Sequence, residues 1–140
     1  MIRHIGITVY NLQRAVKFYS DLLNPCKIET REEEGEVLDL ISDIKNIKLT
    51  SVKLKFGDGN ILELLHYNES EIPGINKALN GIGISHIAIT VENLDNLYRE
   101  LLKQNIIFNA PPQIKGNVKI TFCRDYEGNL IELVEELKNG

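Results

Sequence analysis

Residues 4–12 read His-Ile-Gly-Ile-Thr-Val-Tyr-Asn-Leu, and residues 86–94 read His-Ile-Ala-Ile-Thr-Val-Glu-Asn-Leu, so seven of the nine positions are identical. A second repeat follows downstream, Gly-Asn-Ile-Leu-Glu-Leu-Leu at 59–65 and Gly-Asn-Leu-Ile-Glu-Leu-Val at 128–134. Each half of the chain therefore opens with a histidine-bearing segment and closes with a glutamate-bearing one. Self-similarity of this kind predicts a fold built from two duplicated modules.

The repeat sets the expected organisation of the chain. We expect module one at 1–67, a linker at 68–83 that contains two glycines and a Pro-Gly pair, and module two at 84–137. The histidine-to-glutamate span is 63 − 4 = 59 residues in module one and 132 − 86 = 46 in module two. The 13 additional residues are expected within 29–48, where a helical turn is predicted at 37–44.

Each module is predicted to have the order β-α-β-β-β. Residues 3–9 and 85–91 alternate between apolar and mixed positions, as a strand with one buried face does. Asn11 and Asn93 are suitable N-caps for the helices that follow, because an Asn side chain accepts a hydrogen bond from early helical amides. The first helix should end at Asn24-Pro25 and the second near Gln104-Asn105. Hairpins are expected around 57–60 and 125–128, with one further strand per module near 27–31 and 106–108.

The predicted fold class is therefore α+β. We expect one domain, 1–140, in which two tandem β-α-β-β-β modules form a curved, cup-like mixed sheet with helices outside. The mixed faces of the strands would then line the inside of the cup.

Composition narrows the classes of protein. The chain has 140 residues, is 43% hydrophobic and carries a formal net charge of −4, which argues against nucleic acid as a partner. No apolar run reaches the roughly 18 residues that span a bilayer, and no signal-peptide pattern opens the sequence. Cys26 and Cys123 do not form a CxxC motif, so we expect free thiols and a cytoplasmic protein without a membrane partner.

Strand parity isolates four polar residues. Glu63 lies on the face opposite Leu62 and Leu64, and Glu132 on the face opposite its own aliphatic neighbours. A lone strand histidine or glutamate is commonly a packed or edge residue, but two of each repeated in register favour a site. We predict that these residues converge on one divalent metal (zinc, nickel, cobalt, iron or manganese), with positions left open for water or substrate. The predicted ligands are His4, Glu63, His86 and Glu132.

These motifs resemble those of the vicinal oxygen chelate superfamily, which contains glyoxalase I, bleomycin resistance proteins and dioxygenases. The openings at 4–7 and 86–89 resemble the family's metal-binding strands. The segment Phe-Cys-Arg-Asp-Tyr-Glu-Gly-Asn-Leu-Ile-Glu-Leu at 122–133 resembles its closing hairpin, except that Tyr126 stands where proline is expected. The resemblance covers nearly the whole chain and implies the same four metal ligands. It also implies a homodimer, with sites built either within one chain or between two.

The resemblance implies a reaction in which two adjacent substrate oxygens chelate the metal, so that a nearby C–H becomes acidic. A glyoxalase I-like lyase or isomerase would convert the hemithioacetal of a 2-oxoaldehyde to a 2-hydroxyacyl thioester through an enediolate, with glutathione as the candidate co-substrate. Glu132 is expected to be the main base, with Glu63 facing it across the metal.

Two other functions are kept open. An acyl-CoA epimerase of the methylmalonyl-CoA type is similar but usually has Gln near the position of Glu63. A non-catalytic binding or resistance protein would lack the metal set. Pocket-lining residues are expected at Thr8, Thr90, Tyr67, Phe122 and Arg124. His66 lies on the opposite face by parity and is left out of the site, and Cys123 is interpreted as a packed side chain.

Overall fold

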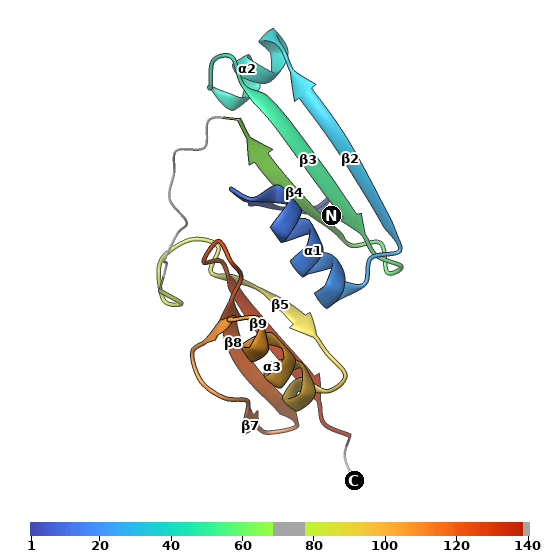
Figure 1. Cartoon of the computed structure of the whole chain (residues 1–140), viewed down its shortest axis with the longest axis vertical. Coiled ribbons are helices and arrows are strands. Elements are labelled where there is room, and N and C mark those ends of the chain that lie inside the picture. The colour runs from blue at the N-terminus through green and yellow to red at the C-terminus, as the bar shows by residue number, and fades with distance from the viewer. Residues whose placement is uncertain (69–77, 139–140) are drawn as a thin grey trace. The chain divides into compact units, whose positions relative to one another are not determined.

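The computed structural model describes residues 1–68 and 78–138 (Figure 1). The chain divides into two compact units, Met1–Pro73 and Gly74–Gly140, which are described here one at a time. Residues 69–77 of the predicted linker lie outside the described residues.

The first unit contains a four-stranded mixed sheet. Its elements are β1 (Ile5–Thr8), α1 (Leu12–Leu23), β2 (Lys27–Glu34), α2 (Glu36–Ser42), β3 (Lys48–Lys55) and β4 (Ile61–Tyr67). The strand order is β1-β4-β3-β2. β1 runs parallel to β4, whereas β3 is antiparallel to both β4 and β2. The first strand of the module therefore lies beside its last strand.

The second unit repeats this plan with five strands. Its elements are β5 (His86–Thr90), α3 (Leu94–Lys103), β6 (Ile107–Phe108), β7 (Gln113–Lys115), β8 (Val118–Arg124) and β9 (Leu130–Glu136). The order is β5-β9-β8-β6, with β7 also paired to β8. Again the first strand, β5, is parallel to the last, β9. Within the described residues, no helix is long and apolar enough to cross a membrane.

Alternation along the strands separates a core face from a mixed face in each sheet. In the first unit, Leu54, Leu62 and Leu64 lie on the core face and are almost fully buried, as are Phe18 and Tyr19 of α1. In the second unit, the core face includes Cys123, Ile131 and Leu133, and α3 contributes Leu94 and Leu101. The apolar stripe of each helix thus packs on the apolar face of its own sheet.

The helix ends are fixed as expected. Asn11 accepts a hydrogen bond from the Arg14 amide, and Asn24 ends α1 in the left-handed conformation. Asn93 likewise accepts from the amide of Asn96 at the start of α3.

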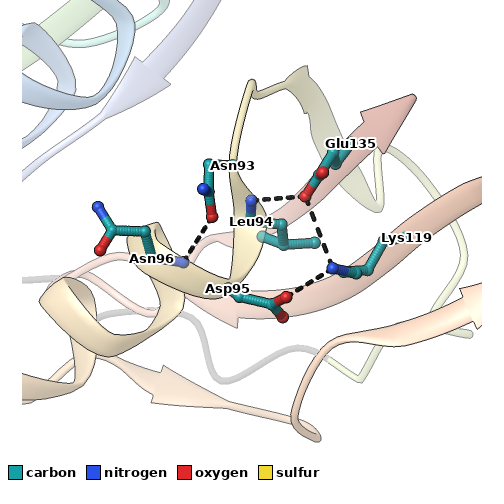
Figure 2. A network of polar contacts seen from close by, with 6 residues as sticks. All are labelled: Asn93, Leu94, Asp95, Asn96, Lys119 and Glu135. Carbon is teal, nitrogen blue, oxygen red and sulfur yellow. Dashed lines mark hydrogen bonds and ion pairs between the residues drawn. The ribbon is translucent and has the colours of Figure 1, made fainter. Parts of the chain in front are cut away.

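A further polar network ties the start of α3 to the sheet (Figure 2). The Leu94 amide donates to Glu135 at 2.7 Å, while Lys119 binds Asp95 at 2.6 Å and lies 3.9 Å from Glu135. These ion pairs, led by the hydrogen bond to Asp95, raise the pKa of Lys119.

The α+β class and the repeated module are confirmed, and α2 lies within the segment predicted to hold the additional residues. Two details differ. β2 extends to Glu34, and the edge strand β7 was not predicted, although Gly116-Asn117 is a two-residue turn between β7 and β8. The described strands pair in two separate sheets, one per unit, and the cup expected between the modules stays a prediction.

Candidate functional site

The first unit brings one predicted histidine and one predicted glutamate together. His4 immediately precedes β1, and Gly6 of that strand lies directly beside Glu63 of β4. Because side chains two residues apart share a face, the imidazole of His4 lies over the carboxylate. Its Nε2 atom is 3.0 Å from Oε2 of Glu63. A Cβ at Gly6 would lie 3.1 Å from the Leu65 side chain, which is tighter than ordinary van der Waals contact, so a small residue fits this position.

The second unit repeats the arrangement. Ala88 of β5 lies beside Glu132 of β9, and His86 is again two residues before the small residue. Nε2 of His86 is 2.9 Å from Oε2 of Glu132. Parallel pairing of the first and last strands thus produces the same imidazole–carboxylate contact twice.

The donor set of each pair is suited to a divalent metal. Imidazole nitrogen and carboxylate oxygen are ligands for zinc and similar ions, and two donors at about 2.0–2.2 Å from one ion can lie about 3 Å apart. Among the described residues, no group of three or more His, Cys, Asp or Glu side chains could hold a metal. Each unit therefore supplies two candidate ligands, one histidine and one glutamate.

The two glutamates differ in their neighbours on the next strand. Lys53 of β3 lies opposite Glu63, with Nζ 3.6 Å from Oε1. Phe122 of β8 lies opposite Glu132, and its ring meets the ring of His86 edge to face at 5.3 Å. Phe122 was predicted to line the site. Lys53 was not, although the repeat makes it the counterpart of Phe122, since both lie ten residues before the glutamate.

His86 has a hydrogen-bonding neighbour directly before it in the sequence, whereas His4 does not have a serine at that position. The Ser85 hydroxyl lies 2.5 Å from Nδ1 of His86, the ring nitrogen that faces away from Glu132. The residue before His4 is Arg3. Sequence reasoning missed Ser85, although its place directly before a candidate ligand is a usable signal.

The remaining predicted lining residues are distributed as follows. By strand register, Thr8 and Tyr67 share the face of Glu63, and Thr90 shares the face of Glu132. Arg124 is on the face of Phe122, and its guanidinium donates to the Gly128 carbonyl at 2.7 Å, within its own hairpin.

Two residues left out of the site do lie elsewhere. His66 is on the opposite face of β4 from Glu63, with Nδ1 3.2 Å from the Val9 carbonyl oxygen. Cys123 is buried on the core face, and burial raises the pKa of its thiol to about 12. Both cysteines are free.

Tyr126, where proline was expected, has a structural contact. Its hydroxyl donates to the carbonyl of Gln104, the C-cap of α3, at 3.0 Å. The closing hairpin is thereby attached to the end of the helix. The turn therefore accepts Tyr126 in place of the expected proline, and Glu132 still pairs with Phe122 across the hairpin.

Comparison with known proteins agrees with this architecture. The family model of the Glyoxalase/Bleomycin resistance protein/Dioxygenase superfamily matches residues 1–133. The lactoylglutathione lyase of Haemophilus influenzae is 29% identical over 138 residues, covering 96% of this chain and 91% of that protein.

Solved structures give the same result. A glyoxalase family protein from Bacillus cereus superposes with a TM-score of 0.85 at 22% identity, covering 97% of this chain and 93% of that one. The trypanothione-dependent glyoxalase I of Leishmania major has a TM-score of 0.64 at 25% identity, with 97% and 86% covered. The chain belongs to the glyoxalase/bleomycin resistance protein/dioxygenase superfamily, as the motifs indicated.

Proposed function

We propose that this chain is a metal-dependent, glyoxalase I-like lyase that converts a hemithioacetal of a 2-oxoaldehyde to a 2-hydroxyacyl thioester. The observation that carries the proposal is the repeated contact between imidazole Nε2 and carboxylate Oε2, at 3.0 Å and 2.9 Å. A set of two histidines and two glutamates matches a lyase of this type better than a binding protein without ligands. The similarity to lactoylglutathione lyases over nearly the whole chain supports the same reaction.

In this proposal His4, Glu63, His86 and Glu132 are the ligands of a divalent ion. The bound ion would supply Lewis-acid chemistry, stabilising the negative charge that develops when a substrate C–H loses its proton. The protein's part is to position the substrate and to accept that proton.

Glu132 is proposed as the base. A neighbouring cation favours the charged form of a carboxylate and so makes it a weaker base. Lys53 is 3.6 Å from Glu63, whereas Phe122 is the cross-strand neighbour of Glu132. Glu63, which already pairs with Lys53, is therefore proposed as a ligand that stays in place, and Glu132 as the group that takes the substrate proton.

The proposal also includes a homodimer, as in other members of the family, and a cytoplasmic location, which two free thiols suit. Glutathione is the proposed thiol. Arg124 and Thr8, Thr90 and Tyr67 are proposed to contact the substrate from the strand faces that carry the metal ligands.

The decisive experiment is thioester formation from methylglyoxal and glutathione. Protein stripped of metal would be reloaded in turn with nickel, cobalt, zinc and manganese, and the product followed by its absorbance. We expect turnover only after reloading, with the most active metal indicating the native one. A folded protein that binds metal yet gives no thioester would contradict the lyase reaction. Exchange of the α-proton of an acyl-CoA with deuterated solvent would then identify an epimerase.

A further inference from the structure

The helix α2, between β2 and β3 of the first unit, displays an apolar stripe on its surface (Figure 1). No residue of the helix is buried. The stripe consists of Val37 (74% exposed), Leu40 (81%), Ile41 (75%) and Ile44 (50%), which we call the α2 stripe. Side chains at this spacing lie along one side of a helix, where apolar residues ordinarily pack on a neighbour.

The first unit holds α2 by its other side. The Asp39 carboxylate accepts hydrogen bonds from the amides of Asn46 and Ile47, at 2.8 Å and 2.9 Å. The Ile44 amide donates to the Asp39 carbonyl at 3.3 Å and so keeps Ile44 at the end of the helix. A helix of 7 residues is not stable in water by itself and usually depends on packing of its apolar side. These contacts therefore fix α2 in place and leave its apolar stripe outward.

The α2 stripe is symmetric about the midpoint between Leu40 and Ile41. In an antiparallel pair of α2 helices related by a two-fold axis, Leu40 of one copy would lie opposite Ile41 of the other. Val37 would lie opposite Ile44 in the same way. A two-fold contact needs a surface that is complementary to itself, and this order of aliphatic residues meets that condition.

The charges at the two ends of the stripe follow the same symmetry. Glu36 stands directly before the stripe and Lys45 directly after it, and both are exposed. Antiparallel pairing would place the glutamate of each copy beside the lysine of the other, whereas parallel pairing would place like charges together. Exposed ion pairs add little affinity, but they select one orientation over another.

The size and charge of the surface predict a reversible contact. Asp39 is engaged by backbone amides, and Glu34 lies 3.6 Å from Lys48 of its own chain. The acids that add like charge to both copies are Glu32, Glu33 and Asp43. The stripe also contributes far fewer residues than the roughly 20–30 per partner of a standard interface. Association through α2 should therefore depend on protein concentration.

We propose that the α2 stripe is an interface between two copies of this chain, packed as an antiparallel pair of α2 helices. The interface uses the first unit alone and does not depend on the metal ligands. It goes beyond the homodimer of the proposed function because it assigns a surface. If that homodimer is formed through a different surface, contact through α2 joins two dimers.

The test is sedimentation equilibrium of the full chain from micromolar to millimolar concentration. We expect Leu40→Gln and Ile41→Gln each to weaken association about tenfold, because every substitution occurs twice in a two-fold contact. At a concentration where the wild type is associated, the mass of these variants should be half that of the wild type. Ile107→Gln is the matched control, since Ile107 is an aliphatic residue of β6 that is 70% exposed, and it should change nothing. Circular dichroism would verify that each variant is folded.

An exchange of charges tests the antiparallel arrangement. Lys45→Glu should weaken association about fivefold, since two exposed ion pairs are lost and like charges face each other. Adding Glu36→Lys to this variant should restore the wild-type association, because both ion pairs form again with their signs exchanged. Adding Glu32→Lys instead gives the same net charge but leaves the acids facing each other, and it should not restore association.

Several results would overturn the inference. They are a wild type that keeps one mass at every concentration, an association that Leu40→Gln and Ile41→Gln leave unchanged, and an equal loss in Ile107→Gln. An unchanged mass with a lower free energy of unfolding in the α2 variants would show that the stripe packs within the chain instead. Failure of the charge exchange would overturn the antiparallel arrangement. Since no metal ligand is altered, each of these results leaves the proposed function standing.

Discussion

The two modules present the same pair of side chains in different surroundings. In the first, Glu63 lies between His4 and Lys53 on a sheet face that also carries Lys27, Glu29 and Lys55. In the second, the neighbours of Glu132 on the corresponding face include the apolar residues Ile120, Phe122, Leu130 and Val134, with Arg124 across from Leu130 at the end of β8. The duplication has therefore preserved the imidazole–carboxylate geometry, which depends on strand pairing, while the adjacent strand has diverged. That divergence gives two chemically similar glutamates different neighbours, and the different roles proposed for them follow from it.

The largest effect is expected from neutralising each glutamate in turn. Glu132→Gln removes the proposed base and should lower turnover at saturating metal by up to about 10⁴-fold. Glu63→Gln should act chiefly by weakening metal binding, with a smaller loss of turnover once metal is saturating. Steady-state kinetics over a metal titration would measure both.

Glu136→Gln serves as the control for this pair, because Glu136 is exposed at the end of the same strand as Glu132. Equal losses of turnover for Glu63→Gln and Glu132→Gln at saturating metal would remove the distinction between the two glutamates.

The next largest difference is expected in the reactivity of the two thiols, one in each module. Cys123 is fully buried, and its pKa is raised from 9.0 to about 12. At pH 8 its thiolate is therefore about a thousandfold less populated than that of a cysteine with the ordinary pKa. Cys26 is exposed. Iodoacetamide should therefore label one thiol per native chain and two after unfolding, as counted by mass spectrometry. Labelling that persists in native Cys26→Ser would show that the core of the second unit opens readily.

A tenfold effect is expected from Ser85, which contacts His86 in the second unit. A hydroxyl can donate to or accept from Nδ1, so Ser85 can hold the ring while Nε2 of His86 is either protonated or bound to metal. Ser85→Ala should weaken zinc binding about tenfold, whereas Arg3→Ala, at the matching position of module one, should have little effect. Chelator competition measures both, and an unchanged affinity in Ser85→Ala would exclude this positioning role.

The smallest effect concerns Tyr126. Tyr126→Phe removes the hydrogen bond to the Gln104 carbonyl and should reduce the free energy of unfolding by about 0.5–1.5 kcal/mol. Urea denaturation followed by circular dichroism would detect the change. Because the hydroxyl only attaches the hairpin to α3, zinc affinity should stay at the wild-type value; a changed affinity would mean that the turn also positions Glu132.

The sequence was sufficient to predict the parts of the site that depend on strand periodicity. Alternation along each strand places His4 and Glu63 opposite the apolar face, and this needs no knowledge of the neighbouring strands. The repeat predicts the same placement for His86 and Glu132. The sequence did not single out Lys53 from the other lysines and arginines. The residue that a long side chain contacts depends on its cross-strand neighbour, which one strand's own pattern does not give. That neighbour follows from the register of the β3–β4 hairpin, and the matching hairpin in module two already placed a residue of interest, Phe122, at the equivalent position.

The parallel pairing of each module's first and last strands has a consequence for how the protein folds. His4 and Glu63 are 59 residues apart, and their contact needs β1 to pair with β4 across the whole intervening module. Such long-range parallel closure is entropically costly and slow. During synthesis, the ligand pair of module one therefore cannot form before β4 has left the ribosome. In the proposed function, metal loading would accordingly be coupled to the completion of folding, and a truncated or half-made chain should not sequester the ion.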